Sequence, residues 1–120
     1  MSHILLIEDE SAIRNLAAIH LRLAGHTVSE AGNGKDGVVQ FHLSKPDLVI
    51  TDLVMPEQGG FETIMILQQT NPKPKIIGMS GSAHAPAFLK MATALGARRT
   101  LSKPFTKQSL LSVVDEVLAA

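Results

Sequence analysis

Acidic side chains stand at the ends of two short apolar runs in the sequence. Glu8 and Asp9 directly follow the run 4–7, and Asp52 ends the run 47–52. Short apolar runs of this kind are typical of buried parallel strands, whose carboxyl ends meet at one edge of a sheet. We therefore expect the three carboxylates to lie close together. Like charges at such distances oppose folding unless a cation neutralises them, and oxygen ligands suit a hard ion, so these residues predict a Mg²⁺ site.

A hydroxyl and an ammonium group stand at the ends of two later runs. The apolar run 75–79 leads to Ser80, and the short run 99–102 leads to Lys103. A bound Mg²⁺ leaves room for phosphate oxygens, which a hydroxyl and an ammonium can bind. A carboxylate would then act as the nucleophile and form an aspartyl phosphate. Alone, Ser80 or Lys103 is more typical of a cap or a surface cation, and Glu8 or Asp9 fits a solvated turn about as well as a site. Their combination favours a site.

The elements that must position these residues alternate along the whole chain. We expect strands at 4–7, 27–30, 47–52, 75–79 and 99–102. The spacing of apolar residues predicts helices at 11–24, around 38–41, and at 61–67, 88–95 and 110–118. Gly25 and Gly96 stand where C-terminal helix caps are expected, and Thr106 is expected to be an N-cap. Five strand–helix units predict an α/β fold in a single domain over residues 1–120.

The composition excludes several classes of protein. The chain has 120 residues, 45% of them hydrophobic and 18% charged, which suits one buried core and argues against a disordered segment. Eleven basic residues balance eleven acidic ones, so no broad basic field indicates nucleic acid or an anionic membrane. The sequence has no cysteine, no apolar run near the length of a membrane span and no basic signal-peptide start. We expect a cytoplasmic protein that recognises its partners locally.

Residues 32–37 match the GxGxxG pattern of dinucleotide-binding turns, but their context argues against that function. A dinucleotide fold places this turn after its first strand, whereas the first strand here ends in Glu8 and Asp9, whose charges would repel a pyrophosphate. The glycines more simply shape the turn into the second helix. A flavodoxin-like cofactor-binding domain is a further alternative, disfavoured because the chain has no Tyr or Trp to stack on a flavin.

Taken together, these residues and their order resemble the receiver domain of two-component response regulators. The resemblance covers nearly the whole chain and rests on Glu8-Asp9, Asp52 with Met55-Pro56, Ser80 and Lys103-Pro104-Phe105. It implies a flavodoxin-like fold, a doubly wound three-layer sandwich whose parallel five-stranded sheet has the order 2-1-3-4-5. It also implies that Asp52 accepts a phosphoryl group from a phosphohistidine of a sensor histidine kinase or histidine phosphotransfer protein. The bond between Lys103 and Pro104 is then expected to be cis.

The resemblance further implies roles for single residues. Asp9 would be a direct Mg²⁺ ligand, Glu8 would act through water, and the backbone carbonyl of Val54 would be a further ligand. Ser80 would be the hydroxyl that responds to phosphorylation, and Lys103 would pair with the phosphoryl group.

The sequence departs from the family pattern at positions that bear on mechanism. Thr100 stands where many receivers carry an aromatic residue that swings inward on phosphorylation, so switching would pass through Ser80, the loop after it and the fourth helix. Val54 and Ser82 stand on the path of the attacking water in this family, and neither is a strong acid or base. We therefore expect slow self-dephosphorylation.

The function implied by the resemblance is signalling, and any enzymatic activity concerns the chain's own phosphorylation and dephosphorylation. Phosphorylation would favour an active conformer and present the fourth helix, fifth strand and fifth helix to a downstream protein target or a missing output domain. We expect no direct binding of nucleic acid or membrane. The chain would be a stand-alone regulator or a receiver excised from a larger protein. The alternative is a pseudo-receiver that binds partners without phosphorylation.

Helix 11–24 also carries residues outside the site. We place Leu16 on its buried stripe and interpret His20 as a half-buried packing residue. Ile19 and Leu23 form a second apolar edge, which we interpret as packing more readily than as a docking surface.

Overall fold

The computed structural model describes residues 2–55, 58–81 and 85–120, and in this part of the chain strands and helices alternate. The strands are β1 (His3–Ile7), β2 (Thr27–Ala31), β3 (Leu48–Asp52), β4 (Lys75–Gly81) and β5 (Arg99–Lys103). The helices are α1 (Ser11–Leu23), α2 (Gly34–Ser44), α3 (Gly60–Leu67), α4 (Ala85–Ala94) and α5 (Lys107–Ala119). The predicted order of five strand–helix units is confirmed.

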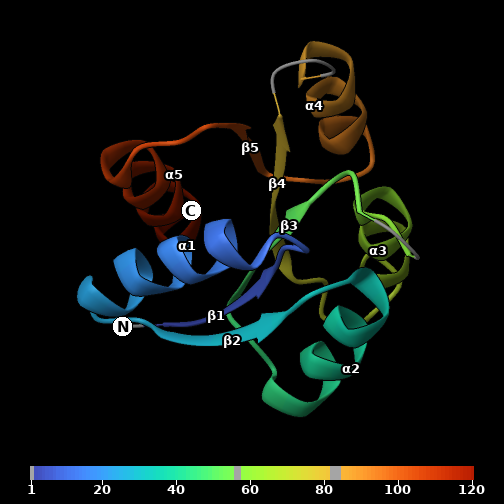
Figure 1. Cartoon of the computed structure of the whole chain (residues 1–120). Helices are drawn as coiled ribbons and strands as arrows, with labels where there is room; N and C mark the ends of the chain where they lie inside the picture. Colours follow the sequence, from blue (N-terminus) through green and yellow to red (C-terminus); the bar gives the residue numbers. More distant parts are fainter. Residues whose placement is uncertain (1, 56–57, 82–84) are drawn as a thin grey trace.

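The strands form one parallel sheet in the order β2-β1-β3-β4-β5 (Figure 1). The predicted flavodoxin-like order is therefore confirmed. The register places Asp52 opposite Met79, and Lys103 opposite Gly81. The carboxyl ends of β1, β3, β4 and β5 consequently lie at the same edge of the sheet, where the residues of the candidate site were expected.

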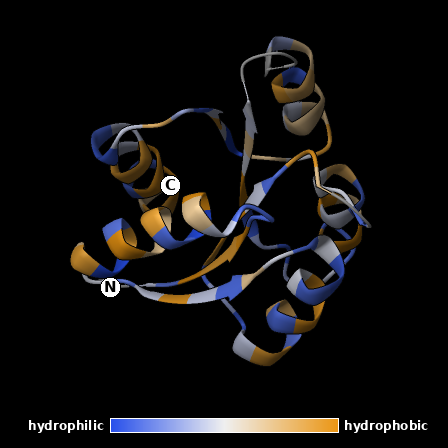
Figure 2. Ribbon diagram, in the orientation of Figure 1, coloured by the Kyte–Doolittle hydropathy of each residue, from blue (hydrophilic) through white to orange (hydrophobic). Residues whose placement is uncertain are grey.

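Helices cover both faces of the sheet and complete three layers. One core cluster joins alternate strand residues, such as Ile4 and Leu6, to α1 and α5. The other cluster joins Leu5 and Ile7 to residues of α2, α3 and α4. Each β1 side chain from residue 4 to 7 is fully buried, which explains why this strand is apolar without alternation. Figure 2 shows the matching pattern on the helices, where hydrophobic and hydrophilic residues alternate in bands.

Local sequence signals account for several helix ends. The Thr106 side chain accepts a hydrogen bond from the Ser109 amide while the Ser109 hydroxyl accepts one from the Thr106 amide, which confirms the N-cap of α5. Gly25 and Gly96 adopt φ angles of 98° and 116°, in the left-handed region that follows many helices. Asn33 caps α2 by accepting a bond from the Asp36 amide. The glycine-rich segment 32–37 is thus a helix entry, as predicted.

Some element limits differ from the sequence prediction. β4 runs two residues further than expected and includes Ser80, because its backbone stays paired with β5 as far as Gly81. α2 begins at Gly34, several residues earlier than the apolar spacing indicated, because the Asn33 cap sets its start. The cis peptide bond before Pro104 was predicted and is confirmed.

One prediction for α1 is wrong. Leu16 was placed in the buried stripe, and Ile19 and Leu23 were interpreted as packed. Their exposed fractions are instead 49%, 52% and 74%, respectively. The buried face is made by the small residues Ala17 and Ala18 together with Leu21, so the larger neighbours point outward.

His20 is half-buried, as predicted, and within the described residues its Nδ1 atom is buried without a hydrogen-bond partner.

None of the helices in the described ranges is long and apolar enough to cross a membrane.

Candidate functional site

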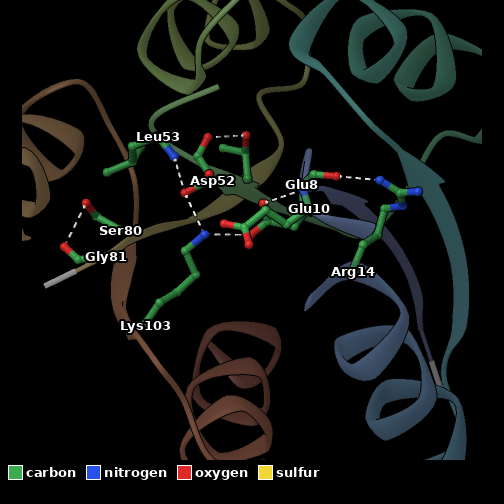
Figure 3. A network of polar contacts seen from close by, with 9 residues as sticks. Glu8, Glu10, Arg14, Asp52, Leu53, Ser80, Gly81 and Lys103 are labelled. Atoms are coloured by element: carbon green, nitrogen blue, oxygen red, sulfur yellow. Dashed lines mark hydrogen bonds and ion pairs between the residues drawn. The ribbon is translucent and has the colours of Figure 1, made fainter. Parts of the chain in front are cut away.

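The residues singled out for chemistry come from four strands. Glu8 and Asp9 follow β1, Asp52 is the last residue of β3, Ser80 lies near the end of β4 and Lys103 ends β5. Figure 3 shows Lys103 reaching up between Asp52 and Glu8, with Ser80 on the other side of Asp52. Residues up to 95 positions apart in the sequence thus share one small space.

Three carboxylates converge as expected. Glu8, Asp9 and Asp52 each offer a carboxylate oxygen, and these oxygens all lie within 4.8 Å of one another. Glu8 is fully buried, Asp52 is 4% exposed and Asp9 is partly exposed. A cluster with oxygen donors only, one of them open to solvent, fits a hard divalent cation such as Mg²⁺, which retains water ligands.

Lys103 is the cation that faces this cluster. Its Nζ atom lies 2.8 Å from Glu8 Oε1 and 3.3 Å from Asp52 Oδ1, and 12% of its side chain is exposed. When Glu8, Asp9 and Asp52 are all ionised, one ammonium group leaves two negative charges uncompensated. A divalent cation carries the charge that would neutralise them.

Burial sets the acid–base behaviour of these groups. Loss of hydration raises the pKa of Glu8 from 4.5 to about 7, against the opposing effect of the Lys103 hydrogen bond. Burial likewise raises the pKa of Asp52, again against Lys103. Burial alone would lower the pKa of Lys103, but its contacts with Glu8 and Asp52 outweigh that effect and raise it. The cluster therefore favours either a proton or an added cation.

The oxygens of the carboxylates differ in how they are engaged. Asp52 Oδ1 contacts Lys103 and accepts a hydrogen bond of 3.0 Å from the Leu53 amide. No described residue hydrogen-bonds the other oxygen, Oδ2. Glu8, in contrast, uses both oxygens, since Oε1 binds Lys103 and Oε2 accepts from the Glu10 amide at 3.2 Å. Asp52 thus has an oriented carboxylate with one uncommitted oxygen.

The other described residues that the sequence singled out lie in β4, on the turn after β3 and in β5. Ser80 is 1% exposed, and its hydroxyl points to the Gly81 carbonyl at 3.5 Å, at the limit of a hydrogen bond. Val54 is half-exposed on the turn after β3. Thr100 is the second residue of β5, partly buried and opposite Gly78. Pro56 and Ser82, which the sequence also singled out, lie outside the described residues.

Arg14 is a contact that the sequence prediction missed. Its Nη1 atom donates to the Glu8 carbonyl at 2.7 Å, and its Nε atom lies 3.5 Å from Glu30 Oε1 of β2. A side chain that binds a backbone carbonyl leaves no residue pattern, and the only available signal was an arginine in the first turn of the helix that follows the acidic pair.

Comparisons with known proteins bear on the family to which the chain belongs. A family model described as "Response regulator receiver domain" matches residues 4–115. Chemotaxis protein CheY of Halobacterium salinarum is 32% identical over 117 residues, which cover 98% of this chain and 97% of that protein. The solved structure of chemotaxis response regulator CheY4 of Vibrio cholerae has a TM-score of 0.89 at 26% identity and covers 98% of both chains.

A longer relative matches over the same region. Transcriptional regulatory protein GlrR of Escherichia coli strain K12 is 30% identical over 117 residues, which cover 98% of this chain and 26% of GlrR. The chain therefore spans about a quarter of that relative and nearly all of the chemotaxis proteins.

Proposed function

The chain belongs to the response regulator receiver domain family of two-component signalling, and from this premise we propose that Asp52 accepts a phosphoryl group in a Mg²⁺-dependent reaction. The observation that carries this proposal is the unequal engagement of the Asp52 carboxylate. Lys103 and the Leu53 amide hold Oδ1, while no described residue hydrogen-bonds Oδ2. A fixed carboxylate with one open oxygen suits a nucleophile.

The step is a transfer between two nucleophiles. Asp52 Oδ2 attacks the phosphorus of a phosphohistidine, the P–O bond forms, and the P–N bond breaks with its electron pair returning to the imidazole. The product is an acyl phosphate. Such transfers depend on positioning and on neutralising the charge of the phosphoryl oxygens. The Lys103 ammonium lies 3.3 Å from Asp52 Oδ1, and the Ser80 hydroxyl is a donor that would reach a phosphoryl oxygen after rotating away from Gly81.

Asp9, Asp52 and the Val54 carbonyl would hold the metal, with Glu8 acting through water because both of its oxygens already have partners. Bound Mg²⁺ would supply positive charge toward the phosphoryl oxygens. The donor set supports this assignment, because its carboxylate oxygens lie within 4.8 Å of one another.

The partners follow from the chemistry of donor and product. The donor is a sensor histidine kinase or a histidine phosphotransfer protein, and the phosphorylated form changes the surface made by α4, β5 and α5. That surface would bind a downstream protein or an output domain of a longer chain, and we place the process in the cytoplasm. Ser80 lies in β4 opposite Ser102 of β5, which is one element of that surface.

Intact mass measurement tests the proposal. We expect the protein incubated with acetyl phosphate and Mg²⁺ to gain one phosphoryl group, and Asp52→Asn to gain none. Asp115→Asn is the matched control, because it removes an exposed carboxylate on α5 and should leave the gain unchanged. A gain that persists in Asp52→Asn or without a divalent metal would contradict the proposal. The same holds if the wild type gains nothing from acetyl phosphate and nothing from a phosphorylated kinase.

A further inference from the structure

The Arg14 side chain connects three segments beside the acidic cluster. It leaves the first turn of α1, donates from Nη1 to the Glu8 carbonyl at 2.7 Å and reaches Glu30 of β2 with Nε at 3.5 Å. Figure 3 shows it on the opposite side of Glu8 from Lys103. With 22% of its side chain exposed, Arg14 is more enclosed than an ordinary surface arginine. Its contacts therefore join α1, β2 and the turn after β1.

The turn that carries the acidic pair is held at two points of its backbone. The Glu8 amide donates to the Ala31 carbonyl at 3.0 Å, and the Glu8 carbonyl accepts from Arg14. The Glu8 carbonyl and the Asp9 amide belong to one planar peptide unit. Fixing that carbonyl consequently fixes the plane from which the Asp9 side chain departs, and Asp9 is the most solvent-accessible carboxylate of the cluster.

Arg14 is itself held in place. Glu30 Oε1 faces Arg14 Nε, while Glu30 Oε2 binds Arg22 Nη2 at 3.1 Å. Arg22 also donates to the Val28 carbonyl at 3.2 Å, and half of its side chain is exposed. The two arginines therefore carry the same charge and bind the same partner, Glu30. Of the pair, only Arg14 contacts the turn of the acidic cluster.

We infer that Arg14 is a positioning residue for metal binding, which holds the turn 8–10 in the shape that presents Asp9 to Mg²⁺. The inference rests on the proposed function. It concerns affinity for the metal, because a turn that is already fixed loses less conformational freedom when its carboxylates bind an ion. Groups that hold metal ligands in place commonly change metal affinity by about 10–100-fold when they are removed.

The charge of Arg14 and its contact with the turn predict opposite changes in Mg²⁺ affinity when the side chain is removed. A guanidinium group beside a cation site repels Mg²⁺, so loss of its charge alone would tighten metal binding. Loss of the bond to the Glu8 carbonyl would weaken metal binding instead. The direction of the change therefore separates the two effects.

Calorimetric titration with Mg²⁺ at fixed ionic strength tests the inference, a suitable method because the chain has no Trp or Tyr to report binding by fluorescence. We expect Arg14→Met to weaken Mg²⁺ binding and raise its dissociation constant about tenfold. Arg22→Met is the matched control, since it removes an equal charge and a contact with the same partner, Glu30. It should change the dissociation constant by less than about twofold. Arg14→Lys should fall between wild type and Arg14→Met, because an ammonium can donate to one acceptor but lacks the fork that spans both.

The possible outcomes are distinct. If Arg14→Met binds Mg²⁺ as tightly as wild type or tighter, or if Arg22→Met loses as much, the inference is wrong while the proposed function stands. If the wild type binds no Mg²⁺, the proposed function fails, and the inference fails with it. Circular dichroism verifies folding of each variant. Amide exchange of Glu10, whose N–H binds Glu8 Oε2, should be faster in Arg14→Met without metal, and Arg14→Lys gives the same comparison if Arg14→Met does not fold.

Discussion

The acid–base chemistry of Glu8 is set by its place in the fold. It is fully buried, and its carboxylate accepts hydrogen bonds from the Lys103 ammonium and the Glu10 amide. Those partners favour the ionised form, but burial outweighs them and raises the pKa of the carboxyl from 4.5 to about 7. A proton and a nearby metal ion are thus alternative ways to relieve the same excess of negative charge.

This shift predicts how stability depends on pH in the absence of divalent metal. A raised carboxyl pKa means that the folded chain binds the proton more tightly than the unfolded chain. The contribution of Glu8 to the free energy of unfolding is complete below pH 4.5 and is lost as the pH rises through about 7. The loss is on the order of 3 kcal/mol, and the raised pKa of Asp52 acts in the same direction.

Urea unfolding at several pH values with EDTA present measures this dependence. Glu8→Gln, which resembles the protonated carboxyl, should remove most of the fall between pH 4.5 and 7. Glu116→Gln is the control, because it neutralises an exposed carboxylate whose ion pair, with Arg99, lies far from the acidic cluster in sequence and is itself exposed. An unfolding free energy that rises with pH across this window in wild type, or an equal fall in Glu8→Gln, would contradict the assignment.

Val54 predicts the lifetime of the phosphorylated form. Its half-exposed aliphatic side chain cannot orient a water molecule for attack on the acyl phosphate, so the phosphoryl group should be lost slowly. Val54→Gln should speed the loss by about tenfold, since an amide can hydrogen-bond water. Met65→Gln is a matched control on α3 with a similar exposed fraction of 52%. Rapid loss from wild type in Mg²⁺, followed by intact mass, would show that the prediction is wrong.

At the scale of elements, the junction of β3 and α3 fixes the backbone of the proposed acceptor. Gly60 begins α3, and its amide donates to the Leu53 carbonyl at 3.2 Å. A Cβ atom at Gly60 would collide with the Asp52 carbonyl and the Leu53 Cα. The helix can approach the strand this closely because the side chain is absent.

Gly60→Ala should therefore destabilise the fold by about 1–3 kcal/mol and disturb Asp52. Gly81→Ala is the matched control, because a Cβ there meets no atom within 4 Å, and its free energy of unfolding should change little. Urea unfolding of both variants gives the comparison. Equal stability of the two variants would mean that α3 can move away from β3 without cost.

Most elements could be predicted because their signals are local. The apolar runs, the cap residue Thr106 and the stop at Gly96 each act within a few residues, and the structure confirms them. Leu16 could not be placed correctly, because apolar spacing alone does not tell which side of a helix meets the sheet. The extension of β4 through Ser80 depends on pairing with β5, a contact between distant segments.

The site was predictable to the same extent. Convergence of Glu8, Asp9, Asp52 and Lys103 follows from parallel strands that end at one edge, and the structure brings the four together. The contact of Arg14 with a backbone carbonyl was not predictable, because any donor of suitable reach could make it.

At the scale of the whole molecule, a chain without net charge concentrates negative charge at one edge of its sheet. A divalent cation that binds only the folded chain must stabilise the entire domain by mass action, by about 2.7 kcal/mol at one hundred times the dissociation constant. We expect this gain in urea unfolding with MgCl₂ relative to NaCl at equal ionic strength. Asp9→Asn should abolish most of it. Equal stability in both salts would contradict the metal site.

The most direct test of the central claim is to locate the phosphoryl group. Borohydride reduces an acyl phosphate to an alcohol, so treatment of the phosphorylated protein should convert Asp52, and no other acid, to homoserine in the peptide that contains it. Mass spectrometry of the digested protein reads this change, which should need Mg²⁺ during phosphorylation. Homoserine at Asp9 instead, or no reduced residue in a protein that has gained a phosphoryl group, would show that Asp52 is not the acceptor.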